Sequence, residues 1–146
     1  MLLAILAVAV VAGAAGGVAF WGPGEPERVC ARSAQLRTQR GVTLTPEAME
    51  AFLEAERLAG RRIEVIESFR SCREQARACR RICGNRRGCP GTCAPPGLSW
   101  HQRGLAIDIS EEYLRDSRVV RALQQTGWCQ SVPQNDPGHF SFDGCH

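Results

Sequence analysis

The sequence predicts a small α+β domain that is stapled by disulfides, and three observations support this fold class. A chain of 146 residues allows one domain and leaves little room for a second. Helical and strand patterns follow one another without the regular alternation that a parallel sheet requires. Eight cysteines accompany only 6% aromatic residues, so we expect covalent cross-links to support a small core. A composition of 44% hydrophobic and 23% charged residues excludes a disordered or collagen-like chain.

The first helix is predicted to begin at residue 45. Thr45 offers a hydroxyl cap, Pro46 occupies the first turn, and Glu47 lies near the positive end of the helix. Gly60 ends the helical pattern. The apolar residues that recur at helical spacing between these ends are Met49, Phe52, Leu53 and Leu58.

Two further helices are predicted from their caps. Ser71 and Glu74 form a capping box, and the helix that they open runs to about Ile82. Ser110 is expected to cap a third helix, which ends at Gly127. Between and after the helices, period-2 or buried apolar patterns predict strands at residues 62–67, 104–109, 128–132 and 139–142.

The first 24 residues form an apolar leader. Residues 1–24 carry no charged side chain, and about 20 apolar residues suffice to span a bilayer. Small residues at 12–14 and 17–19 suit a signal peptidase. No basic residue precedes the apolar run, and Trp21 lies where an interfacial aromatic would, which favours an uncleaved anchor through residues 1–21. Signal peptide and membrane anchor both stay open.

The rest of the chain is divided into a linker and N-terminal segment, residues 25–44, and a folded domain, residues 45–146. The even number of cysteines is typical of an oxidising compartment, whereas the downstream arginines favour a location inside the cell. We give more weight to the cysteines, because the charge rule is only a bias. The domain is therefore expected to be exported to the periplasm, the cell envelope or the medium.

A cysteine-rich insert, residues 79–93, contains a C-x3-C, x5, C-x3-C array. Four thiolates at this spacing could hold a structural zinc ion, but exported thiols oxidise, so a disulfide-stapled loop is the favoured interpretation. The pairing of eight cysteines does not follow from their spacing. The other four cysteines are Cys30, Cys72, Cys129 and Cys145.

The same region is rich in arginine. Residues 70–87 hold seven arginines and the single acid Glu74. A solvated basic face is the favoured interpretation, because no aromatic residues interleave the arginines for base stacking and the net charge is only +3. Nucleic acid is therefore not an expected partner.

Two of the three histidines stand beside acidic residues. His101 and Asp108 form an H-x6-D pair, and His139 follows Asp136 in the segment D-P-G-H. Two imidazoles and one carboxylate make a three-ligand set that leaves a fourth metal position open for water. Asp108 lies in an apolar strand, where an unpaired charge would be costly, and Asp136 could take a proton from a metal-activated water. Spacing alone also allows ordinary polar residues at these positions.

Three ordered segments resemble one family. Residues 96–108, PGLSWHQRGLAID, resemble the P-G-x-S-x-H-x-x-G-x-A-x-D motif of VanY-type D-alanyl-D-alanine carboxypeptidases, zinc peptidases grouped with the lysostaphin-type peptidases and the hedgehog domain. Residues 67–75 are similar to the S-G-Y-R-S-x-x-x-Q stretch of the family, and residues 136–140 to its E-P-W-H box. The resemblance covers residues 45–144. It implies an antiparallel sheet with flanking helices, a Zn²⁺ cofactor, a peptidoglycan stem peptide as substrate and a monomeric protein.

The resemblance also implies roles for individual residues. By it, His101, Asp108 and His139 are the zinc ligands, and Asp136 is the catalytic carboxylate. Arg70 matches the family arginine that holds the polarised carbonyl oxygen or the substrate carboxylate, a task that suits a permanently charged group with several donors.

Two more residues are candidate substrate contacts. Ser99 either orients substrate or caps the turn before His101. Gln75 is expected to secure the loop of Arg70 rather than to touch substrate.

Two departures from the family pattern leave the cleaved bond open. Asp136 stands where carboxypeptidases usually have Glu, and in having the shorter acid the chain resembles the L-alanyl-D-glutamate endopeptidases. Gly138 replaces a bulky aromatic residue of the carboxypeptidase pattern. We expect a D-alanyl-D-alanine carboxypeptidase. The alternatives are a peptidoglycan endopeptidase and a non-catalytic zinc-binding module that recognises the cell wall.

Overall fold

The computed structural model describes residues 35–84, 89 and 92–144. The predicted leader, with Cys30 and Cys145, lies outside these residues. A two-stranded sheet pairs β1 (Arg37–Gln39) with β2 (Val42–Leu44), and a four-stranded antiparallel sheet has the order β3-β4-β6-β5. Its strands are β3 (Val65–Glu67), β4 (Ala106–Ile109), β5 (Trp128–Cys129) and β6 (His139–Phe142). The helices are α2 (Pro46–Ala59), α3 (Cys72–Cys83), the 3-10 helix η1 (Trp100–Arg103), α4 (Glu111–Arg115) and α5 (Ser117–Gln125). The predicted α+β class is confirmed.

Local capping explains where α2 and α3 begin. Thr45 Oγ1 accepts a hydrogen bond from the backbone N–H of Ala48 at 3.3 Å, and Gly60 ends α2 in the left-handed conformation with φ 67°. The predicted capping box is present: Glu74 N–H donates to Ser71 Oγ, and Ser71 N–H donates to the Glu74 carboxylate.

The prediction of one helix from 110 to 127 is wrong, because the chain breaks at Asp116. Its backbone is extended, with φ −86° and ψ 100°, and its side chain accepts a hydrogen bond from Arg118 N–H, so Asp116 caps α5 instead of continuing α4. The strand predicted at 128–132 is also shorter, since β5 contains only two residues.

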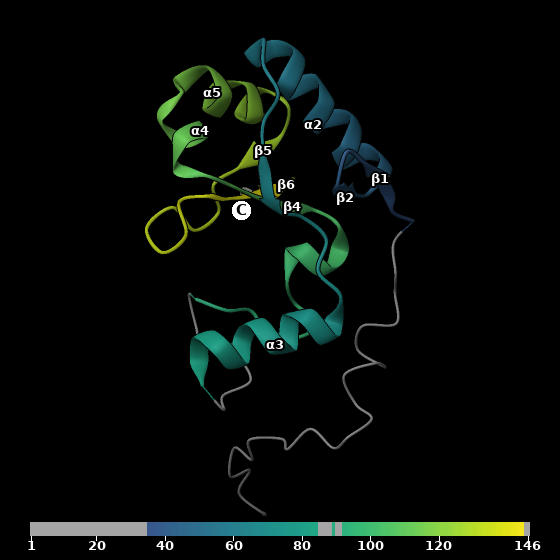
Figure 1. The fold of residues 1–146 in the computed structure, drawn as a ribbon, viewed down its shortest axis with the longest axis vertical. Helices are drawn as coiled ribbons and strands as arrows, with labels where there is room; N and C mark the ends of the chain where they lie inside the picture. Colours follow the sequence, from purple (N-terminus) through teal and green to yellow (C-terminus); the bar gives the residue numbers. More distant parts are fainter. Residues whose placement is uncertain (1–34, 85–88, 90–91, 145–146) are drawn as a thin grey trace, which may run out of the picture.

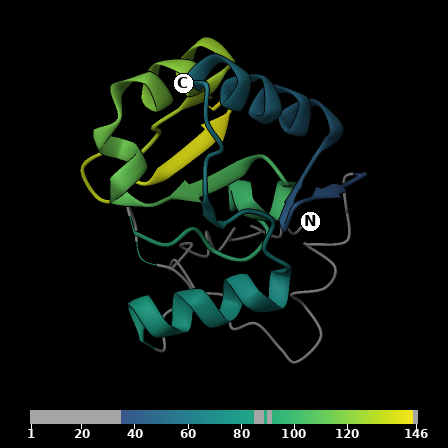
Figure 2. The same cartoon turned by 45° about the horizontal axis from the view of Figure 1, so that its top comes forward.

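The core lies between the four-stranded sheet and three helices. Helices α2, α4 and α5 lie together on one side of this sheet, whereas α3 lies on the opposite side (Figure 1, Figure 2). Ile107 and Ile109 of β4 point into the core, so Asp108 between them points to the other face. The largest fully buried hydrophobic side chains are Trp128, Phe52, Phe140, Leu44, Met49, Ile107 and Leu123.

The cysteine-rich insert is closed by disulfides. Cys79 pairs with Cys93, and Cys83 pairs with Cys89, so the favoured interpretation of the insert is confirmed and a four-thiolate zinc site is wrong. Cys72 and Cys129 are disulfide-bonded as well. In the described part of the chain, none of the helices is long and apolar enough to cross a membrane.

Candidate metal centre and active site

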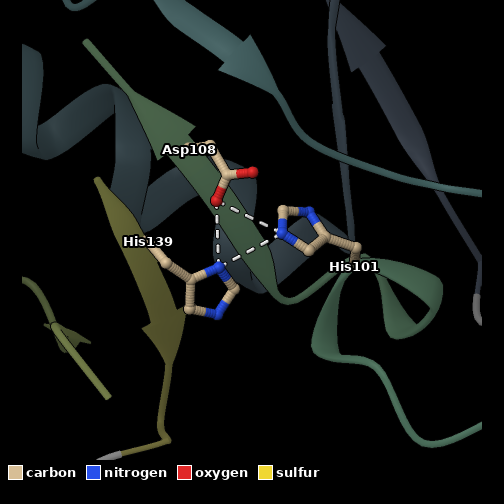
Figure 3. A group of neighbouring side chains, drawn as sticks. All are labelled: His101, Asp108 and His139. Atoms are coloured by element: carbon tan, nitrogen blue, oxygen red, sulfur yellow. Dashed lines mark hydrogen bonds and ion pairs between the residues drawn. The ribbon is translucent and has the colours of Figure 1, made fainter. Parts of the chain in front are cut away.

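The antiparallel pairing of β4 and β6 brings two predicted ligands together. Asp108 lies directly opposite His139 in the register of the two strands, and both side chains point away from the core. His101 comes from η1, which leads into β4 after Gly104 turns the chain at φ 67°. Figure 3 shows the three side chains pointing toward one another from these three elements.

The three side chains converge on a small volume. Asp108 Oδ1 lies 2.9 Å from His139 Nδ1 and 3.3 Å from His101 Nε2, and the two ring nitrogens are 3.2 Å apart. The side chains are largely shielded, with exposures of 5% for His101, 19% for Asp108 and 12% for His139. The structure thus brings together all three of the residues that the resemblance implies as ligands.

Each ring has a hydrogen-bond partner on the side that faces away from the group. His101 Nδ1 lies 2.6 Å from the carbonyl oxygen of Ser68, which can only accept, so Nδ1 carries the proton and Nε2 presents a lone pair. His139 Nε2 lies 3.1 Å from Ser141 Oγ. When Nε2 donates to this hydroxyl, His139 Nδ1 also presents a lone pair to the group.

This donor set fits a zinc ion. Two lone pairs and a carboxylate at these separations repel one another unless a cation lies between them. A tetrahedral ion with bonds of about 2.0–2.1 Å separates its ligand atoms by about 3.3 Å. The distances from His101 Nε2 to Asp108 Oδ1 and to His139 Nδ1, 3.3 Å and 3.2 Å, agree with this value, and the distance of 2.9 Å from Asp108 Oδ1 to His139 Nδ1 is shorter. Burial alone would raise the pKa of Asp108, but hydrogen bonds and positive charge from His101 and His139, when no metal is bound and their rings carry protons on this side, outweigh it and hold the pKa below its ordinary value. Asp108 therefore offers an ionised oxygen.

Arg70 lies beside this group in the loop after β3. Its Nε donates to Glu67 Oε1 at 2.7 Å, its Nη2 donates to Glu67 Oε2, and its Nη1 donates to Gln75 Oε1 at 2.7 Å. Burial alone would lower the pKa of Arg70, but the carboxylates of Glu67, Asp108 and Asp136 outweigh it and raise the pKa. The guanidinium is therefore permanently charged and held in a set orientation.

The backbone of this loop is joined to the first histidine. Arg70 N–H donates to the carbonyl of His101 at 3.2 Å, and Phe69 N–H donates to the carbonyl of Thr43 at 3.1 Å. Ser68 Oγ in turn accepts a hydrogen bond from Thr43 N–H at 3.0 Å. The Arg70 loop, η1 and β2 are thus connected as one frame around the site.

The two candidate substrate contacts are both buried. Gln75 is 1% exposed, and both ends of its amide are used within the protein, since Nε2 donates to the carbonyl of Ala94 at 2.6 Å. Ser99 is 5% exposed and precedes η1, but its side chain makes no capping hydrogen bond. Capping by the Ser99 side chain is therefore not observed.

Asp136 is not one of the three converging residues. It is exposed, in the turn before β6, where its N–H donates to the carbonyl of Val132 and its own carbonyl accepts from His139 N–H. Within the described chain its carboxylate makes no hydrogen bond or ion pair, although its charge acts on Arg70.

Gly138 has a packing reason to lack a side chain. A Cβ atom there would lie 2.6 Å from the carbonyl oxygen of Ile109, whose N–H donates to Gly138 at 3.0 Å. The departure from the aromatic of the family pattern therefore follows from the close approach of this turn to β4.

Sequence reasoning missed Glu67 and Ser141 as partners of site residues. Ser141 is fully buried and lies two residues after His139 in the same strand. Residues two apart in a strand share a face, so this periodicity could have revealed Ser141 as a partner.

A converging His–Asp–His group on an antiparallel sheet, beside a fixed arginine, is typical of a metal-dependent hydrolase. The chain belongs to the VanY D-alanyl-D-alanine carboxypeptidase family, whose model matches residues 42–143. The family resemblance seen in the sequence is thereby confirmed.

Solved structures show the same fold. A structure of VanYB in complex with D-alanine-D-alanine has a TM-score of 0.57 at 20% sequence identity and covers 78% of this chain and 80% of that chain. A mutant of the vancomycin-resistance D,D-pentapeptidase VanY from a VanB-type resistance cassette, in complex with Zn(II), has a TM-score of 0.55 at 20% identity and covers 77% and 80%. No curated protein sequence matches this chain.

Proposed function

We propose that this protein is a zinc-dependent D-alanyl-D-alanine carboxypeptidase that removes the terminal D-alanine of peptidoglycan stem peptides. One observation carries the proposal: His101 Nε2, Asp108 Oδ1 and His139 Nδ1 converge beside Arg70 in a chain of the VanY family. The geometry fits the proposed ligands, and the family supplies the substrate class.

His101, Asp108 and His139 would hold the metal. When bound, zinc lowers the pKa of a coordinated water and polarises the carbonyl of the peptide bond. The protein contributes a fixed orientation of both rings, through the bonds of His101 to the Ser68 carbonyl and of His139 to Ser141.

Asp136 is proposed as the general base and acid. Hydrolysis forms a bond between the water oxygen and the carbonyl carbon, breaks the C–N bond, and moves one proton from the water to the leaving amine. Asp136 takes that proton and then gives it to the amine. In support, its carboxylate is exposed, forms no ion pair among the described residues and lies in the turn that leads to His139.

Arg70 is proposed to bind the substrate oxygens. A guanidinium has five N–H donors, and Arg70 uses three of them on Glu67 and Gln75, which leaves two for a ligand. Two donors in a planar fork suit either the polarised carbonyl or the terminal carboxylate of a D-alanine.

We further propose that the protein acts outside the cytoplasm, with residues 1–21 as a possible tether and a monomeric catalytic domain. The described cysteines, all of them disulfide-bonded, support an oxidising compartment.

A peptidoglycan endopeptidase is the second candidate. It is favoured by the two departures from the carboxypeptidase pattern, Asp136 in place of Glu and Gly138 in place of an aromatic. An endopeptidase, which cleaves within the stem peptide, does not need a free C-terminal carboxylate on its substrate.

Mass spectrometry of three stem peptides tests these functions. The first is a pentapeptide ending in D-Ala-D-Ala, the second is its C-terminal amide, and the third is the tetrapeptide that lacks the last alanine. A carboxypeptidase removes one alanine from the first peptide and leaves the other two intact. Cleavage after the first L-Ala in all three would identify an endopeptidase instead. Three untouched peptides, with zinc bound, would favour a non-catalytic cell-wall-binding module.

A further inference from the structure

We propose that the Cys79–Cys93 disulfide orients Arg70 through Gln75, which acts as a positioning residue between the cysteine-rich insert and the active site. The proposed function supplies the role of Arg70 in substrate binding. The physical linkage itself stands on contacts within this chain.

Gln75 has only one possible amide orientation. Arg70 Nη1 can only donate, so the atom that faces it at 2.7 Å must be the amide oxygen of Gln75. The carbonyl of Ala94 can only accept, so the amide nitrogen must face it at 2.6 Å. A buried amide that lost either partner would retain an unsatisfied polar group. Gln75 therefore links the position of Arg70 to the position of Ala94.

The disulfide determines where Ala94 lies. Cys93 precedes Ala94, and Cys79 lies one turn after Gln75 on α3, with 5.6 Å between the two cysteine Cα atoms. Both sulfurs lie 3.5 Å from Gln75 Nε2, and both cysteines are buried, at 1% and 7% exposure. The cross-link thus holds the segment of Ala94 against the face of α3 that carries Gln75.

Glu67 alone would hold Arg70 less firmly. The side chain of Glu67 is 41% exposed, whereas that of Arg70 is 12% exposed. An ion pair that water reaches on one side is screened and contributes little to order. Gln75 supplies the buried contact on Nη1, which fixes the plane of the guanidinium and the direction of its two remaining donors.

The second disulfide provides a matched control. Cys83 and Cys89 belong to the same insert, and Cys89 pairs with Cys93 through backbone hydrogen bonds. Among the described residues, the Cys83–Cys89 sulfurs make no hydrogen bond to Gln75 or Ala94. Each disulfide stabilises the fold mainly by restricting the unfolded chain, so removing either one lowers stability. Removing the Cys83–Cys89 bridge leaves the link from Ala94 through Gln75 to Arg70 in place.

The experiment compares the full chain with two double variants, Cys79→Ser/Cys93→Ser and Cys83→Ser/Cys89→Ser. Nuclear magnetic resonance measures solvent exchange of the Arg70 Nε proton, which an Arg70→Lys variant assigns. Kinetics on the D-Ala-D-Ala pentapeptide give KM and kcat. Zinc content and thermal unfolding show that each variant is folded and loaded at the temperature used.

Loss of the Cys79–Cys93 bridge should raise both the exchange rate of the Arg70 Nε proton and KM about tenfold. A tenfold change corresponds to the loss of about one hydrogen bond. Loss of the Cys83–Cys89 bridge should leave both within about twofold of the parent. Equal effects of the two double variants, or no effect of the first, would overturn the proposal.

If the Cys79→Ser/Cys93→Ser variant does not fold, Gln75 variants test the linkage instead. Gln75→Met keeps the side-chain volume and removes both hydrogen bonds, so it should reproduce the faster exchange. Gln75→Glu keeps an acceptor for Arg70 but loses the donor to the Ala94 carbonyl, so exchange should be fast in this variant as well. Slow exchange in Gln75→Glu would show that the bond to Ala94 is not needed and would overturn the linkage. Exchange that is unchanged in Gln75→Met would contradict the linkage. Because this readout needs no turnover, an inactive but zinc-loaded parent chain would refute the proposed function alone.

Discussion

Asp108 and His139 lie directly opposite one another on β4 and β6, with Asp108 Oδ1 2.9 Å from His139 Nδ1. Neither residue can reach the other if the register slips by one, because every side chain of the strand then changes face. The core residues Ile107 and Phe140 fix that register by pairing on the opposite face. The hydrophobic core therefore positions the candidate metal centre.

Ser141 is predicted to set zinc affinity. Ser141→Ala removes the hydroxyl that orients His139, and the smaller side chain fits the buried site. Loss of such an outer hydrogen bond costs about 10- to 100-fold in metal affinity, which competition with a chelating dye measures. The control is Ser131→Ala, since Ser131 is exposed and its hydroxyl bonds Ser141 rather than His139. Equal affinities for the Ser141 variant and the parent would refute this role.

Asp136 is predicted to be needed for turnover but not for metal binding. Asp136→Ala should lower kcat by about 10²- to 10⁴-fold, the usual contribution of a general base, while zinc content stays unchanged. Gln134→Ala, in the same exposed turn, is the control. If the Asp136 variant turned over at the parent rate, another group would have to be the base.

Gly138 is predicted to be required for packing. The Cβ of Gly138→Ala would lie 2.6 Å from the Ile109 carbonyl, so β4 or the turn must shift. We expect a loss of about 1–3 kcal/mol, typical of overpacking, in denaturant unfolding. Pro137→Ala, at its exposed neighbour, should change stability by less. An unaltered midpoint for Gly138→Ala would mean that the turn does not approach β4 this closely.

Asp116 is predicted to give a pH-dependent contribution to stability. Hydrogen bonds from the Arg118 side chain and backbone, with the charge of Arg118, lower its pKa from 3.8 to about 2. A carboxyl whose pKa is lower in the folded state stabilises above its unfolded pKa, and this contribution is lost as the pH falls toward about 2.

Asp116→Asn keeps a capping side chain and removes the charge. The variant should therefore melt below the parent at pH 7, and the difference should shrink between about pH 4 and pH 2. A melting difference that is the same at pH 7 and pH 2 would show that the charge contributes nothing.

Features that depend on local hydrogen bonds were predictable from the sequence. Thr45 and Ser71 each bond a backbone N–H three residues ahead, so the starts of α2 and α3 follow from short segments. The break between α4 and α5 at Asp116 could not be predicted from the sequence, because an Asp can lie within a helix or cap one. A bond from Arg61, 55 residues away, favours the cap.

In the candidate site, too, local patterns were predictable from the sequence and contacts between distant residues were not. The spacing of His101, Asp108 and His139 indicated a donor set, and the strand register brings them together. The links from His101 to Ser68 and from Gln75 to Ala94 join residues 33 and 19 positions apart. The second of these depends on a disulfide pairing that spacing does not determine.

The most direct test of the zinc centre is metal reconstitution with the D-Ala-D-Ala pentapeptide as substrate. The protein is stripped with a chelator and titrated with Zn²⁺, and mass spectrometry follows release of D-alanine. The stripped protein should release no D-alanine and should recover fully at one equivalent of zinc, and the His139→Ala variant should neither bind zinc nor release D-alanine. Release of D-alanine by the stripped protein at the original rate would contradict it.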